Sequence, residues 1–136
     1  MSLSIHLVFD GQCETAFRFY EECFGAKVIT MLKWSESPAA SQAPPGAADR
    51  IMHATLKLAD SYVFGADAFP GKYETPKGFS VLFSVGNPQE AEQVFQKLAD
   101  GGNVTMPLQE TFWAKSYGVV TDKYGIPWEI NCSKPR

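Results

Sequence analysis

The chain has 136 residues, 45% of them hydrophobic and 20% charged, and a formal net charge of -3. This composition is typical of one globular domain, and a slightly negative chain without a Lys/Arg cluster disfavours binding to nucleic acid or to an anionic membrane. No apolar run is long enough for a spanning helix, and the N-terminus lacks a signal-peptide pattern. We therefore expect a cytoplasmic protein, and its three cysteines are expected to be free thiols.

The first half of the chain predicts a strand, a helix and three further strands. The strands are predicted at residues 3–9, 26–34, 51–58 and 62–66, and the helix at residues 13–24. In the first strand, His6 lies on the face opposite Leu7 and Phe9. Asp10 can cap the helix, and Gly25 ends it. Residues 35–49 are rich in Pro, Ala, Ser and Gly, and they predict a long mobile loop.

The second half repeats this order. Its strands are predicted at residues 79–85, 104–106, 112–121 and 126–131, and its helix at residues 88–99. Asn87 is a good capping residue, and Pro88 and Glu90 follow it at positions that favour a helix start. We expect one domain, residues 1–136, in which module one (about 1–68) and module two (about 77–132) share a core, because each is small for independent stability.

The last strand contains a charged residue that needs a partner. Trp128, Ile130 and Cys132 fall on one face of this strand, and Glu129 and Asn131 fall on the other. An unpaired carboxylate in a half-buried strand is costly. We therefore expect Glu129 to have a functional or structural partner.

The order of elements, together with several short segments, resembles the vicinal oxygen chelate superfamily, which has the glyoxalase/bleomycin-resistance/dioxygenase fold, and within it the PhnB-like branch. The matching segments are IHLVFDG (5–11), scattered positions of 16–25, IMHA (51–54), DAF (67–69), GGNVTMPLQ (101–109), TFW (111–113) and scattered positions of 117–131. The resemblance implies an α+β fold of two βαβββ modules, whose curled mixed sheets form a cup with the helices outside. It also implies a homodimer. Members that catalyse reactions bind one divalent metal, through ligands on the first and last strands of each module.

Two of these four ligand positions match. His6 stands at the first-strand position and Glu129 at the last-strand position, which makes them candidate ligands for Zn, Ni, Mn or Fe. His53 is a third candidate, at a position that the superfamily does not use. We place Ser80 or Val81 at the third position, and residues 63–65 (VFG) offer no carboxylate at the remaining one. The alternative is that His6 and Glu129 bond each other without a metal.

Six residues are candidates for binding an organic ligand: His53, Gln109, Thr111, Trp113, Tyr117 and Asn131. Aromatic side chains can stack on a flat ligand, and the polar ones can form hydrogen bonds with it. The alternatives are core packing for the aromatics and turn formation for the polar residues. The chain has no nucleophile motif, P-loop, dinucleotide fingerprint or Gly-rich methyl-donor loop, so the sequence does not support a methyltransferase.

The first hypothesis for function is a protein that binds a small molecule in the cup between the modules, with no established catalysis. A second is a metal-dependent lyase, isomerase or transferase that acts on a small oxygen-rich substrate, in which the ion polarises a carbonyl group. A third is a resistance protein that sequesters a drug. Whether the protein is an enzyme is left open by the sequence.

Overall fold

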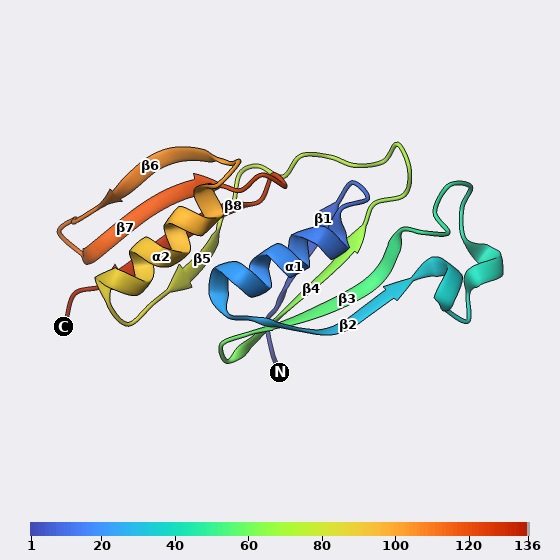
Figure 1. Cartoon of the computed structure of the whole chain (residues 1–136), viewed down its shortest axis with the longest axis horizontal. Helices are drawn as coiled ribbons and strands as arrows, with labels where there is room; N and C mark the ends of the chain where they lie inside the picture. Colours follow the sequence, from blue (N-terminus) through green and yellow to red (C-terminus); the bar gives the residue numbers. More distant parts are fainter. Residues whose placement is uncertain (136) are drawn as a thin grey trace. The chain divides into compact units, whose positions relative to one another are not determined.

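The computed structural model describes residues 1–135 and divides the chain into two compact units, Met1–Glu74 and Thr75–Arg136. Each unit contains one four-stranded mixed sheet and one long helix (Figure 1). The predicted modules fall inside these limits, while the shared core stays a prediction. None of the helices within residues 1–135 is long and apolar enough to cross a membrane.

The first unit has the predicted order of elements. These are β1 (Ile5–Phe9), α1 (Cys13–Phe24), β2 (Lys27–Lys33), β3 (Ile51–Leu58) and β4 (Ser61–Asp67). The strands are arranged in the order β1-β4-β3-β2, with β1 parallel to β4 and the other pairs antiparallel. The first strand of the unit therefore pairs with the last one.

Helix α1 packs on this sheet through a continuous aromatic stripe. Ala16, Phe17 and Tyr20 are fully buried, because they recur at the spacing of one helical face. Gly25 ends the helix in the left-handed conformation (φ 67°), as predicted. The sheet can approach the helix closely because Gly65 in β4 has no side chain beneath Phe17.

Gly65→Ala is expected to lower the free energy of unfolding by about 1–2 kcal/mol, because overpacking strains a close-packed core. The added Cβ would lie 2.7 Å from Phe17 Cζ and 3.2 Å from the Leu7 carbonyl oxygen. Urea denaturation monitored by tryptophan fluorescence measures the loss. Gly86→Ala is the matched control, since a Cβ there meets nothing within 4 Å. Equal stability of the two variants would contradict the close contact.

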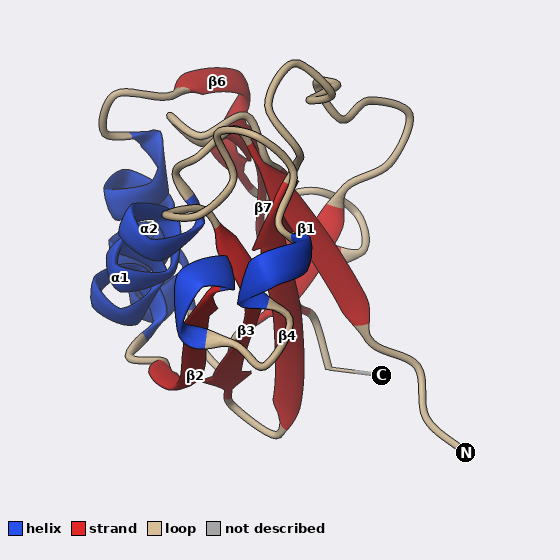
Figure 2. Cartoon of the chain, turned by 90° about the vertical axis from the view of Figure 1, so that its right-hand side faces the viewer, coloured by secondary structure: helices blue, strands red, loops and turns tan. Residues whose placement is uncertain are grey.

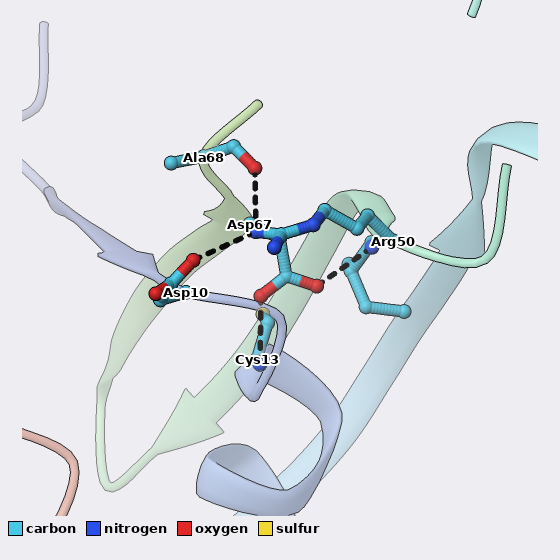
Figure 3. Close-up of polar contacts among 6 residues, drawn as sticks. Asp10, Cys13, Arg50, Asp67 and Ala68 are labelled. Atoms are coloured by element: carbon cyan, nitrogen blue, oxygen red, sulfur yellow. Dashed lines mark hydrogen bonds and ion pairs between the residues drawn. The ribbon is translucent and has the colours of Figure 1, made fainter. Parts of the chain in front are cut away.

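Asp67, at the end of β4, connects three segments of the first unit (Figure 3). Its Oδ1 accepts a hydrogen bond from the Cys13 amide at 2.9 Å, and its Oδ2 accepts one from the Ile51 amide at 2.8 Å. The carboxyl therefore accepts hydrogen bonds from the first residue of α1 and from the first residue of β3. The prediction that Asp10 caps α1 is wrong: Asp10 accepts a hydrogen bond from Arg50 Nη1 at 3.1 Å instead.

The segment between β2 and β3 is more ordered than residues 35–49 suggest from composition. It contains two short 3₁₀ helices, η1 (Trp34–Glu36) and η2 (Ala40–Gln42), which face the viewer in Figure 2. The Ser35 amide donates a hydrogen bond to the Ala48 carbonyl at 2.9 Å, and Ala47 is fully buried. Short i→i+3 turns leave no long hydrophobic period, so the sequence pattern does not reveal them.

The second unit repeats the topology of the first. Its elements are β5 (Val81–Ser84), α2 (Pro88–Ala99), β6 (Asn103–Gln109), β7 (Ala114–Thr121) and β8 (Pro127–Ser133). They are arranged as β5-β8-β7-β6, again with the first strand parallel to the last. The predicted internal repeat is therefore confirmed.

Helix α2 begins as predicted. Asn87 Oδ1 accepts a hydrogen bond from the Glu90 amide at 2.8 Å, and Pro88 occupies the first turn, where a missing N–H costs nothing. The buried stripe consists of Ala91, Val94, Phe95 and Leu98. The predicted strand starts at Phe79, but this residue precedes β5 and is 47% exposed, so the strand is shorter than its hydrophobic pattern.

The turn between β7 and β8 is built around Asp122, which is only 3% exposed. Its Oδ1 accepts hydrogen bonds from the amides of Tyr124 (2.8 Å) and Ile126 (3.1 Å). Its Oδ2 accepts one from Trp128 Nε1 at 2.9 Å. Because Trp128 is thereby fixed on the buried side of β8, its neighbour Glu129 lies on the other side.

Candidate functional site

The far face of the second sheet, meaning the face that does not contact α2, carries a row of polar residues. Strand pairing places Gln109 opposite Tyr117, Tyr117 opposite Asn131, and Asn131 opposite Ser84. Residues that pair directly point to the same side of a sheet. We call these four residues the polar row; it brings together three of the predicted ligand-binding residues from β6, β7 and β8.

Glu129 lies beside the polar row, between two apolar neighbours. It pairs with Val119 on β7 and with Leu82 on β5. The hydroxyl of Tyr117 reaches it diagonally and donates a hydrogen bond to Glu129 Oε1. This bond, together with burial and the negative charge of Glu129, raises the pKa of Tyr117 to about 12. The phenol is therefore kept neutral and remains a donor.

Asn131 is the most deeply buried member of the polar row, at 8% exposure. Its Nδ2 donates to Ser133 Oγ at 3.0 Å and approaches Ser84 Oγ at 3.5 Å. Its Oδ1 is buried and has no hydrogen-bond partner among the described residues. Turning the amide over would exchange an unpaired acceptor for an unpaired donor. One end of the amide thus lacks a partner in either orientation.

Aromatic side chains from the β6–β7 connection extend this surface. The Trp113 ring lies edge to face with Tyr117, with the centroids 5.4 Å apart, and Trp113 is 48% exposed. Phe112 contacts Trp113 and is almost fully exposed. Thr111, a predicted ligand-binding residue, has its hydroxyl engaged as the acceptor of the Ala114 amide at 2.9 Å. The hydroxyl of Thr111 therefore closes the turn.

The first unit carries the two histidines on the far face of its own sheet. His6 pairs with Phe64, and the His53 ring stacks on the same Phe64 with a centroid distance of 6.2 Å. His53 Nε2 also lies 3.4 Å from Thr55 Oγ1. Both histidines are exposed, as the strand alternation predicts for His6. They form a separate cluster around an aromatic ring.

The pairing of the first and last strands of each unit shows which residues lie opposite the two predicted metal ligands, His6 and Glu129. Pairing β1 with β4 places Phe64 opposite His6, and pairing β5 with β8 places Leu82 opposite Glu129. Each sheet thus offers one metal donor beside one hydrocarbon side chain. Within neither unit, over the described residues, do three His, Cys, Asp or Glu side chains gather. Within each unit, this donor set falls short of the three or four protein ligands that a zinc site has.

The register also changes one assignment made from the sequence. Ser80 or Val81 was expected at the first-strand position of the second unit. The residue that pairs with Glu129 as His6 pairs with Phe64 is instead Leu82. The sequence left the register between β5 and β8 open by one or two residues, and a shift of one residue moves a side chain to the other face.

The cysteines do not contribute to this surface. Cys13, Cys23 and Cys132 are free and buried. Burial, with the nearby Asp67 carboxyl, raises the pKa of the Cys13 thiol above its ordinary range. A thiol that stays protonated is a poor nucleophile, so Cys13 packs as a small apolar side chain.

Two members of the surface were not predicted from the sequence. Ser84 and Ser133 both approach the amide of Asn131. Serines in strands are common and carry no motif, so only the pairing between β5 and β8 identifies Ser84. The alternation of β8 places Ser133 on the face of Glu129 and Asn131, which is a signal that could have included it.

The Tyr117–Glu129 bond predicts an observable titration. Tyr117 should ionise with a midpoint near pH 12 in the wild type, and near its ordinary value of about 10 in Glu129→Ala. The pKa of Tyr117 is higher in the folded state than in the unfolded state. This bond therefore stabilises the fold below about pH 10, and the contribution is lost as pH rises toward 12. Ultraviolet difference absorbance of phenolate, against Tyr117→Phe, measures both midpoints. Identical midpoints in the wild type and Glu129→Ala would contradict the bond.

Several known proteins are similar to this chain in fold and in sequence. The structure of PA1353 from Pseudomonas aeruginosa superposes with a TM-score of 0.90 and 38% identity, covering 99% of both chains. The PhnB protein from Bacillus cereus gives a TM-score of 0.82 and 25% identity, covering 98% of this chain and 100% of that one. A glyoxylase/bleomycin resistance protein/dioxygenase domain from Frankia sp. EAN1pec shares the fold, with a TM-score of 0.66 and 15% identity over 98% of each chain. The chain thus has the fold of the glyoxylase/bleomycin resistance protein/dioxygenase domain.

The sequence shows the family to which the chain belongs. Residues 1–131 match the family described as 3-demethylubiquinone-9 3-methyltransferase, and the chain belongs to that family, in the PhnB-like branch. It is also 34% identical to Protein YjdN of Escherichia coli (strain K12) over 142 residues, covering 98% of this chain and 97% of that protein. The resemblance noted in the sequence is therefore confirmed.

Proposed function

We propose that this protein binds a small organic molecule on the far face of its second sheet, through the Asn131 amide and the Tyr117–Glu129 pair. The observation that carries the proposal is the buried, unpaired end of the Asn131 amide. Buried polar atoms are almost always hydrogen-bonded in proteins, and an unpaired one costs about 1–3 kcal/mol. A ligand that offers the missing partner removes this cost on binding.

The surroundings of Asn131 support a ligand with both polar and flat apolar parts. Gln109, at one end of the polar row, is exposed, and Trp113 presents a half-exposed ring beside Tyr117. An aromatic ring offers stacking area at low conformational cost, while the amide and carboxylate fix orientation. We propose that the ligand binds without a resident metal, because the hydrocarbon side chains of Phe64 and Leu82 lie opposite His6 and Glu129, where further metal ligands would be expected.

Asn131→Leu tests whether the amide serves a ligand or the fold. We expect the ligand-free variant to be as stable as the wild type, because a similar apolar side chain removes an unpaired buried group. Affinity for a ligand should fall at least tenfold. The ligand comes from a thermal-shift screen of small polar aromatics against the full chain, and calorimetry measures its affinity.

Ser133→Ala is the control for that experiment, since it removes a neighbour of Asn131 but leaves Oδ1 unchanged. A large loss of stability in Asn131→Leu, with unchanged affinity, would overturn the proposal. Calorimetric titration of Zn, Ni, Mn and Fe(II), with His6→Ala and Glu129→Ala as controls, tests the metal-dependent alternative. Metal binding abolished by both substitutions would favour the enzyme over the metal-free binder.

The protein is also proposed to be a homodimer, as the superfamily resemblance implies. Light scattering coupled to size-exclusion chromatography gives the mass in solution. A monomer mass at all concentrations would contradict this assignment.

A further inference from the structure

We infer that the ligand of the far face is an organic cation, in the form of an aromatic or alkyl ammonium compound. This inference rests on the proposed function and names the charge class of the ligand. It starts from the carboxylate of Glu129. Among residues 75–135, Glu129 has one hydrogen-bond partner, the Tyr117 hydroxyl, which is neutral. The negative charge is therefore not balanced by its partner.

Among residues 75–135, no basic side chain forms an ion pair with Glu129. Lys134 forms its ion pair with Glu110 at 2.9 Å, and none of the ion pairs among residues 1–135 includes Glu129. Lys115 on β7 lines a groove beside α2, together with Glu92 and Phe95. A partly buried carboxylate between hydrocarbon neighbours gains more from an opposite charge than an exposed one does.

The neighbours of Glu129 suit an ammonium group better than a bare ion. An ammonium nitrogen carries three N–H donors, and the carboxylate of Glu129 is an acceptor on this surface. The unpaired Oδ1 of Asn131 lies on the same face of β8 but is buried. Trp113 adds an exposed aromatic ring next to Tyr117, and cations bind to such ring faces. An ammonium compound with an aromatic or alkyl part can thus offer a charge to Glu129 and an apolar contact to Trp113.

A matched series of aromatic probes tests the charge class. Benzylammonium, benzyl alcohol and benzoate share a ring and differ in charge, and calorimetry with the full chain measures their affinities. We expect benzylammonium to bind at least tenfold more tightly than benzyl alcohol, and benzoate to bind most weakly. Glu129→Gln should reduce benzylammonium to the affinity of the alcohol, because the amide oxygen still accepts from Tyr117 but carries no charge. Asp100→Asn, an exposed charge change in the same unit, should leave the preference intact.

The outcomes separate this inference from the function on which it rests. Equal binding of all three probes, or a preference for benzoate, would overturn the inference that the ligand is a cation. The proposal of small-molecule binding would stand if Asn131→Leu weakens the binding of these probes. A cation preference that survives Glu129→Gln would overturn the role of this carboxylate. Failure of every probe to bind the wild type would count against both proposals.

Discussion

Asp122→Ala is expected to lower the free energy of unfolding by about 3–4 kcal/mol, the largest loss that we expect from a single polar substitution. The carboxyl accepts two backbone amides of the β7–β8 turn and the indole N–H of Trp128. All three donors are left without this acceptor in the variant. Hydrogen bonds to a charged group contribute more than neutral ones, and water has little access to a residue that is 3% exposed.

Guanidinium denaturation followed by tryptophan fluorescence measures this loss, with Asp100→Ala as an exposed control that should change stability by less than about 0.5 kcal/mol. The loss of stability in Asp122→Asn should lie between the losses in Asp122→Ala and Asp100→Ala, since an amide keeps one of the two acceptor oxygens. A loss below about 1 kcal/mol in Asp122→Ala would show that the turn forms without its carboxyl.

Asp67→Ala is expected to destabilise the protein by about 2–4 kcal/mol, through the first unit. The substitution removes the acceptor of the Cys13 and Ile51 amides, at the starts of α1 and β3. The site is 7% exposed, so water replaces the lost oxygens poorly. Hydrogen exchange at these two amides should accelerate more than exchange elsewhere in the first unit.

Asp10→Ala is the matched control, because its carboxyl forms an ion pair with Arg50 at 3.1 Å but is 53% exposed. Such pairs contribute less than about 1 kcal/mol. If Asp10→Ala proved as destabilising as Asp67→Ala, the stability of this corner would come from the arginine rather than from the buried carboxyl.

Local patterns in the sequence were sufficient for both long helices and for the position of most strands. The capping Asn87, the glycine at position 25 and the alternation around Glu129 each act within a few residues, so their structural effect is visible without knowing the fold. The repeat predicted the same order of elements along the chain in both units, but not the order of the strands within each sheet.

Long-range partners were not predictable in the same way. Asp67 resembles any acidic residue at a strand end, and its bonds reach Cys13, which lies far away in sequence. The same holds for Glu129, whose partner Tyr117 depends on the register between β7 and β8. Phe79 shows the opposite error, because the local apolar pattern begins before the strand does, and the predicted strand was therefore too long.

The parallel pairing of first and last strands also has a consequence during synthesis. Ile5 pairs with Val63 and Val81 with Trp128, so the opening strand of each unit has no sheet neighbour until the closing strand exists. A nascent chain on the ribosome must therefore keep β1 unpaired until β4 has emerged, and the wide separation of these partners makes closure slow. Each unit completes its sheet at its C-terminal strand, and for the second unit that strand is also the one that carries Glu129 and Asn131.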